Sequence, residues 1–108
     1  MKGDEVKGHL DLLILSIVGG GTLHGYAVIE RLRERSAGAF DLPEGTVYPA
    51  LHRLERAGQL TSSWSESSGR RRKNYRLTDS GVAALAARRS QWDDFSAAVS
   101  RTLGEGWA

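Results

Sequence analysis

A run of cations near residue 70 has the most evident chemistry in this sequence. Arg70, Arg71, Arg72 and Lys73 are consecutive, Arg76 follows, and no acid lies between residues 69 and 77. Guanidinium and ammonium groups bind phosphate oxygens, and arginine also enters the narrow minor groove of DNA. The run therefore predicts a local positive field, although the net charge is only +2. A charge run can instead be a solvated loop, and Lys73 and Arg76 could lie along a strand and only support the fold.

A second candidate surface lies between residues 43 and 57. Apolar side chains recur there at helical spacing and predict an amphipathic helix. They are Val47, Ala50, Leu51 and Leu54. The opposite face carries hydroxyl, ring and cationic groups, at Thr46, Tyr48, Pro49, His52, Arg53 and Arg56.

An α-helix fits the major groove of DNA, where side chains of its N-terminal end meet base edges and phosphates. Residues 43–57 are therefore the predicted reading helix, although such a face could also be merely solvated. Pro49 is expected in or near the first turn, since a proline further inside loses a backbone hydrogen bond and opens the helix irregularly.

The start of an earlier predicted helix offers one weaker contact. His24 opens that helix, and because a helix N-terminus favours phosphate, it is a candidate phosphate ligand. Tyr26 lies at helical spacing with apolar neighbours and is expected in the core. Thr22 is the expected N-cap of the helix.

No pattern in the sequence indicates catalysis, a metal or a cofactor. His9, His24 and His52 fall on separate predicted helices, and there is no H-x-x-x-H pair, G-x-S-x-G turn or phosphate-binding loop. The glycines at 19–21 are not followed by Lys-Ser/Thr at the required distance. We expect no catalytic residues, no metal ligands and no cofactor.

The same sequence gives no sign of export or membrane insertion. It has no cysteine, which excludes disulfides and thiolate metal sites and fits a reducing compartment. Residues 1–5 lack the order of a signal peptide. The longest apolar stretch, residues 12–18, is too short to span a bilayer. The expected location is the cytoplasm, with no membrane partner.

Three helices are predicted before the cationic run. The first, around residues 10–18, is apolar nearly all round, and Leu12 and Leu15 lie on the side opposite its main stripe. A helix of this kind is buried on two sides, and in so small a chain one side is expected to face a partner. Glycines 19–21 end it. The second helix is expected from His24 to Arg35, and the third ends before Gly58.

A hairpin and a long helix are predicted after Gly58. The expected strands are residues 60–65 and 73–77, with a turn at 66–69 and the arginines at its tip. The last helix runs roughly from Asp79 to Leu103 and carries a heptad-like stripe. Its members are Val82, Leu85, Arg89, Trp92, Ser96, Val99 and Leu103.

This order predicts a mainly α (α+β) fold, a winged helix-turn-helix with a C-terminal dimerisation helix. Residues 1–78 would form the DNA-binding domain. Residues 79–108 would form the dimerisation helix and tail. The partners expected are double-stranded DNA and a second copy of the chain.

Four short segments stand in one collinear order between about residues 8 and 103. They are 12–15 (Leu-Leu-Ile-Leu), 24–26 (His-Gly-Tyr), 45–55 (Gly-Thr-Val-Tyr-Pro-Ala-Leu-His-Arg-Leu-Glu) followed by Gly58, and 69–78 (Gly-Arg-Arg-Arg-Lys-Asn-Tyr-Arg-Leu-Thr) followed by Gly81. Together they make the chain resemble the PadR-type transcriptional regulators, and its short C-terminal region resembles the small subfamily with one helix after the wing.

The resemblance implies a dimeric, ligand-responsive repressor on a palindromic operator, with no enzymatic activity. It implies that a small aromatic effector could stack on Trp92, although an aromatic at such a place is more often plain dimer core. Arg89 and Ser96 could line the gap or could equally face solvent. The dimer interface is expected at Leu12, Leu15, Leu85, Val99 and Leu103. The contrary reading is a winged helix that binds only protein, which would need no cationic wing.

Overall fold

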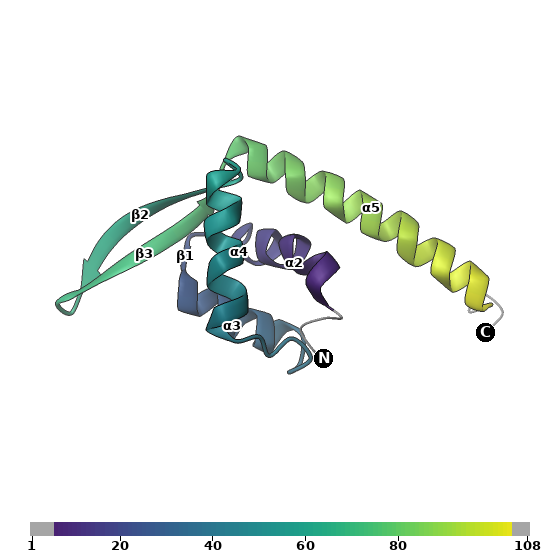
Figure 1. Ribbon diagram of the computed structural model, residues 1–108, viewed down its shortest axis with the longest axis horizontal. Helices are drawn as coiled ribbons and strands as arrows, with labels where there is room; N and C mark the ends of the chain where they lie inside the picture. The colour runs from purple at the N-terminus through teal and green to yellow at the C-terminus, as the bar shows by residue number, and fades with distance from the viewer. Residues whose placement is uncertain (1–5, 105–108) are drawn as a thin grey trace.

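The computed structural model describes residues 6–104. A short 3-10 helix η1 (Lys7–His9) leads into α2 (Leu10–Val18), which is followed by β1 (Leu23–His24), α3 (Gly25–Arg35) and α4 (Glu44–Arg56). The strands β2 (Leu60–Ser67) and β3 (Arg70–Leu77) come next, and α5 (Asp79–Leu103) follows them. Figure 1 shows the hairpin and α5 projecting on opposite sides of a body made by α2, α3 and α4. The predicted α+β winged-helix order is confirmed.

The core lies where the apolar stripes of α2, α3 and α4 meet. Its fully buried side chains include Ile14 and Leu15 from α2, Val28 from α3, and Val47 and Leu51 from α4. The sheet closes one side of this cluster with Leu60 and Tyr75. A 3.6-residue period brings the buried positions of α3 and of α4 to one face of each helix, whereas α2 is buried on two sides, as its nearly uniform apolar character predicts.

Leu15 corrects one expectation about the dimer. Its side chain has no exposed surface, because α2 is wrapped on both sides by elements of its own chain. A residue without accessible surface cannot contact a partner, so the expectation for Leu15 was wrong. Leu85 also packs partly against the core, and a Cβ placed on Gly19 would lie 3.2 Å from its Cδ2 atom.

The hairpin is longer and more regular than the sequence pattern indicated. β2 and β3 pair in antiparallel register from Leu60 opposite Leu77 to Ser67 opposite Arg70. Only Ser68 and Gly69 form the turn, and both have positive φ (52° and 76°), as a two-residue type I′ turn requires. Glu66 and the arginines therefore belong to paired strands and not to a loose tip.

A third strand was not foreseen. β1 is two residues long and pairs with β3, Leu23 opposite Tyr75 and His24 opposite Asn74. A segment this short has no side-chain period to detect, and its pairing depends on the backbone of β3. His24 also replaces Thr22 as the N-cap of α3, because its Nδ1 atom accepts a hydrogen bond of 3.3 Å from the Ala27 N–H.

Pro49 is the sixth residue of α4 and so lies in its second turn, next to the first turn in or near which it was expected. The carbonyl that would have bonded to its missing N–H belongs to Gly45, at the exposed start of the helix. Water can therefore satisfy that carbonyl, which explains how the helix tolerates an interior proline.

Candidate nucleic-acid interface

The outer face of α4 is open to solvent along its length. Pro49, His52, Arg53 and Arg56 are exposed, while Thr46 and Tyr48 are half-buried at its two edges. The helix begins at Glu44 after the N-cap residue Pro43. The predicted reading residues thus share one helix, but they divide between its two sides.

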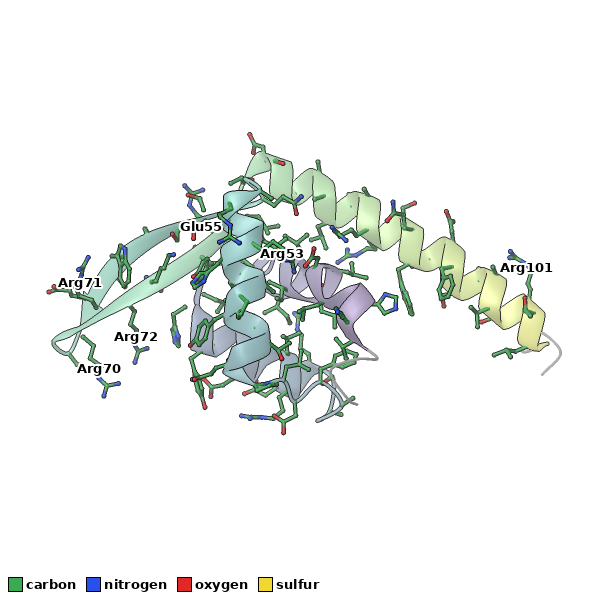
Figure 2. All side chains as sticks on the ribbon, in the orientation of Figure 1. Arg53, Glu55, Arg70, Arg71, Arg72 and Arg101 are labelled. Atoms are coloured by element: carbon green, nitrogen blue, oxygen red, sulfur yellow. The ribbon has the colours of Figure 1, made fainter. Side chains whose placement is uncertain are left out.

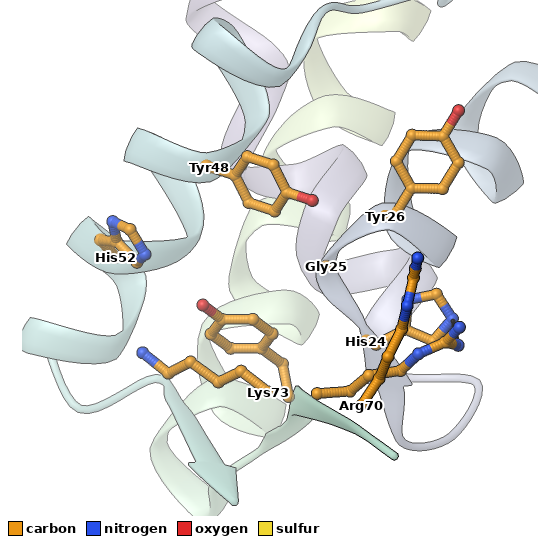
Figure 3. Close-up of a pocket in the computed structure, with 9 residues that line it drawn as sticks. His24, Gly25, Tyr26, Tyr48, His52, Arg70 and Lys73 are labelled. Atoms are coloured by element: carbon orange, nitrogen blue, oxygen red, sulfur yellow. Dashed lines mark hydrogen bonds between the residues drawn. The ribbon is translucent and has the colours of Figure 1, made fainter. Parts of the chain in front are cut away.

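A groove of about 540 Å³ lies between α4, the start of α3 and β3. Its lining combines rings with cationic side chains: His24, Gly25, Tyr26, Tyr48, His52, Arg70, Arg72, Lys73 and Tyr75. Figure 3 shows Tyr48 and His52 of α4 across from Tyr26, His24 and Arg70. Six of the residues predicted to contact DNA are therefore brought together here from three elements.

Tyr26 was expected in the core, and that expectation was wrong. It is 47% exposed and borders the groove. Helical spacing placed it beside apolar residues, but the start of α3 reaches past the edge of the core, so its ring stays in solvent. A large exposed ring beside cations suits contact with a nucleic acid.

Tyr48 is held in place by a glycine. A Cβ atom on Gly25 would lie 2.5 Å from Cε1 of Tyr48, so only glycine lets the ring lie against α3. Burial raises the pKa of the Tyr48 hydroxyl, and Glu44, Tyr75 and Tyr26 raise it further. The group therefore stays protonated near neutral pH and can donate a hydrogen bond to a phosphate or a base.

His24 and Arg72 lie side by side in the groove. Nδ1 of His24 accepts a hydrogen bond from the Ala27 N–H, and its Nε2 lies 3.2 Å from Nη1 of Arg72. The other N–H groups of the guanidinium favour an anionic oxygen, such as that of a phosphate, at this point.

The three arginines of β3 do not point the same way. Alternation along the strand places Arg70 and Arg72 on one face and Arg71 on the other, and Figure 2 shows this divergence. Arg70 and Arg72 line the groove. The guanidinium carbon of Arg71 instead lies 4.7 Å from the ring centre of Trp64, which is 58% exposed on β2.

Lys73 is engaged by an acid. Its Nζ lies 2.9 Å from Oε1 of Glu55 on α4, and the Ser62 hydroxyl donates to Oε2 of the same carboxylate. These bonds from Ser62 and Lys73 lower the pKa of Glu55, and the Glu55 carboxylate raises the pKa of Lys73. Lys73 therefore fastens the hairpin to α4, the supporting role that the sequence left open.

Arg53 is also engaged, on the far side of α4 from the groove. Its two terminal nitrogens each lie 2.8 Å from an oxygen of Asp11 on α2, and Arg88 of α5 lies 3.3 Å from the same carboxylate. The Asp11 hydrogen bonds raise the pKa of Arg53 above its already high value. Thr46, Pro49 and Arg53 line a second groove of about 510 Å³ beside η1, apart from Tyr48 and His52.

The outer half of α5 carries exposed apolar groups. Trp92 is 42% exposed, and the centre of its ring lies 5.2 Å from that of His9 and 6.1 Å from that of Phe95. A groove of about 210 Å³ here is lined by Gly8, His9, Leu12, Arg88, Gln91, Trp92 and Phe95. Trp92 was expected in such a gap and Leu12 at the dimer interface, whereas Arg89 and Ser96, also expected in the gap, do not line this groove.

Sequence reasoning missed Phe95, Asp11 and Arg88. Phe95 could have been found, because it stands three residues after Trp92 and four before Val99 on the same helix face. Asp11 and Arg88 are 77 positions apart, and no local pattern shows which of many opposite charges will meet.

Residues 6–104 contain no cluster of His, Cys, Asp and Glu side chains that could hold a metal ion. None of the helices described in this part of the chain is both long and apolar enough to cross a bilayer.

Comparison with known proteins gives a consistent result. The model of the transcriptional regulator PadR-like family matches residues 14–87. The transcriptional regulator Rv3488 of Mycobacterium tuberculosis is 35% identical over 99 residues, covering 88% of this chain and 90% of that protein. A PadR family transcription regulator from Clostridium difficile is 37% identical with a TM-score of 0.80, covering 89% of this chain and 99% of that chain.

One similar structure includes DNA. It is Bacillus subtilis PadR in complex with operator DNA, which is 28% identical with a TM-score of 0.67. The similarity covers 73% of this chain and 45% of that chain.

Proposed function

Because this chain belongs to the PadR-like family of transcriptional regulators, we propose that it is a homodimeric repressor that binds a palindromic operator and responds to a small aromatic effector. The family consists of regulators and not of enzymes. Residues 1–78 supply the DNA-binding part and residues 79–108 the dimerisation part. A repressor acts where the chromosome lies, which in a bacterium is the cytoplasm.

The groove beside α4 carries this proposal. It gathers phenol, imidazole and guanidinium groups next to an exposed helix, and His24 and Arg72 lie in contact there, with 3.2 Å between Nε2 and Nη1. The operator complex of Bacillus subtilis PadR supports the same use of the fold. In the proposed complex α4 enters the major groove with Thr46, Tyr48, Pro49 and His52, and β3 brings Arg70, Arg71 and Arg72 to the adjacent minor groove.

Arg53 and Lys73 take a different part in the proposal. Both were candidate DNA contacts, and both are held by acids in the free protein. We assign them to the support of α4 and of the wing.

Dimerisation is supported by the exposed face of α5. Trp92, Phe95, Val99 and Leu103 recur at spacings of three and four residues, and each is at least 37% exposed. A stripe of this kind on a helix that leaves the body is suited to a second copy. Two reading helices about 34 Å apart would then meet successive turns of one DNA face.

The effector is proposed to stack on Trp92 in the groove beside η1. The groove is partly apolar and already formed, as small-molecule sites usually are. Loss of the response to planar aromatic compounds in a Trp92→Ala variant supports this part. A retained response would remove it.

The central experiment measures binding to duplexes selected from a random pool, at several salt concentrations. Arg70→Gln and Arg72→Gln should each weaken binding to operator and random duplexes alike. Each should also flatten the slope of log affinity against log salt by about 0.9, since each removes about one phosphate contact. Arg101→Gln removes the same charge from the far end of α5 and should leave the slope unchanged.

Wild-type protein that shows little affinity and no salt slope would contradict the proposal and favour the protein-only winged helix. Slopes unchanged by both wing variants would remove the wing from the interface.

A further inference from the structure

We propose that Asp11 and Arg88 are positioning residues that set the angle between α4 and α5, and thereby the spacing at which a dimer reads its two half-sites. This inference rests on the proposed function. It concerns residues outside the groove beside α4, none of which is assigned to a DNA contact; Arg88 also lines the groove beside η1.

One carboxylate joins three helices. Asp11 on α2 accepts two hydrogen bonds of 2.8 Å from Arg53 on α4 and one of 3.3 Å from Arg88 on α5. Its side chain is 17% exposed, against 52% for Arg53 and 38% for Arg88. The acid is thus the enclosed member of the group, and each arginine reaches it from a different helix.

The two arginines contact Asp11 differently. Arg53 binds both carboxylate oxygens, and a planar guanidinium paired in this way fixes the plane of the carboxylate. Arg88 shares Oδ2 with Arg53 and makes a single contact. Through Asp11, the position of Arg88 and of the third turn of α5 therefore depends on the position of α4.

This contact stands where α5 leaves the body. The beginning of α5 is held by the Thr78 cap and by close packing of Gly81 against the Gln59 carbonyl. Leu85 packs on the core one turn before Arg88. Beyond Arg88 the ring of Trp92 still contacts that of His9, which precedes α2, and the helix then projects away from the body (Figure 1).

A small rotation of α5 at Arg88 displaces the far end of the helix. From Arg88 to Leu103 is 15 residues, or about 22 Å at 1.5 Å per residue. A rotation of about 5° at Arg88 therefore moves the far end of α5 by about 2 Å. If that end carries the partner, the same rotation changes the separation of the two copies of α4. The major groove repeats every 10–10.5 base pairs, so a changed separation selects a different operator spacing.

The test uses the full chain and a duplex series built from the operator that a random pool selects. The series holds both half-sites constant and changes the spacing between them one base pair at a time, and a single half-site serves as a reference. Arg88→Gln is compared with the wild type and with Arg101→Gln, which removes an equal charge from the same helix beyond the Asp11 contact. Arg88→Lys restores a cation that can reach the carboxylate.

We expect Arg88→Gln to lower affinity for the best spacing at least about fivefold, the low end of typical coupling between sites. It should bind neighbouring spacings nearly as well as the best one. Affinity for the single half-site should change less than about twofold, since a lost positive charge far from the DNA has a screened effect. Arg88→Lys and Arg101→Gln should keep the wild-type spacing profile. In an Asp11→Asn background, Arg88→Gln should add no further change.

A wild-type spacing profile in Arg88→Gln would overturn the inference. So would loss of the dimer in sedimentation, because Arg88 would then belong to the interface and not to the positioning of α5. Both results leave the proposed function intact if the wild type binds DNA with one preferred spacing. A wild type without DNA binding would instead overturn the proposed function first.

Discussion

Gly81 shows how much a single position controls at the start of α5. A Cβ atom there would overlap the carbonyl oxygen of Gln59, which belongs to the backbone and cannot turn aside. Gly81 is also the only buried residue that the structure describes in α5. The close approach of α5 to the segment before β2 therefore requires glycine at this place.

Gly81→Ala should lower the free energy of unfolding by about 1–3 kcal/mol, the usual range for an overpacked site. Alanine favours a helix over glycine by about 1 kcal/mol, so propensity alone would give the opposite sign. Urea denaturation measures the difference. Gly45→Ala is the matched control, since a Cβ there meets nothing within 4 Å and should stabilise α4. Equal effects from both variants would show that the overlap is relieved at no cost.

The residue scale also marks the limit of sequence reasoning. The cluster of arginines and the outer face of α4 were predictable because charge and helical period are local properties. Neighbouring residues do not show which arginines line the groove and which are paired with an acid. Arg70 and Arg72 line the groove, whereas Arg53 is bound by an acid 42 positions earlier. The glycine of the His-Gly-Tyr segment, Gly25, is explained only by the Tyr48 ring that packs against it in the structure.

At the scale of elements, Glu55 joins the reading helix to the wing. Its carboxylate on α4 accepts from Ser62 of β2 and Lys73 of β3, so all three elements meet at one side chain. The carboxylate is only partly exposed, which protects the contact from full screening by salt. The hairpin thus has a defined position relative to α4 before it meets DNA.

The attachment should weaken at low pH. The pKa of Glu55 is lowered in the folded protein, so its stabilising effect is present above the ordinary value of 4.5 and is lost as the pH falls through the lower folded value. The unfolding free energy of the wild type should therefore decline in that acid range more than that of Glu55→Gln. Glu66→Gln, which removes an exposed carboxylate of the same hairpin, is the control. Denaturant midpoints from pH 3 to 7 give the comparison, and identical declines in the wild type and Glu55→Gln would contradict it.

The elements themselves were largely predictable. The bounds expected for α3, α4 and α5 agree closely with the structure because their stripes are long and their ends carry caps or glycines. The predicted hairpin was too short, because β2 carries polar residues on both faces. These residues hide the alternation of apolar and polar side chains that identifies a strand. β1 could not be foreseen, because its two residues pair only through the backbone of β3.

The whole molecule measures 57 × 28 × 21 Å, and its length comes from the two projections. The body is a complete core, whereas α5 exposes Phe95 (58%), Leu103 (65%) and Trp92 to solvent. Large apolar groups gathered on a projecting helix are unusual in a protein that works alone. The proposed homodimer accounts for them.

Phe95→Glu should therefore turn the dimer into a monomer, because it places a charge in the middle of the apolar stripe. Affinity for the two-site operator should fall to that of a single half-site. Sedimentation equilibrium measures the first effect and duplex titration the second. Ala83→Glu, on an exposed position near the start of α5 and outside the heptad-like stripe, is the control and should keep the dimer. A dimeric Phe95→Glu would place the contact between subunits elsewhere.

The joint between the hairpin and α5 has a mechanical consequence. Only Thr78 separates β3 from α5, and it is held on three sides: its N–H and hydroxyl donate to the carbonyls of Gln59 and Gly58, and its hydroxyl accepts from Gly81. No flexible linker separates the hairpin from α5. The direction in which α5 leaves the body is therefore tied at Thr78 to the base of the hairpin.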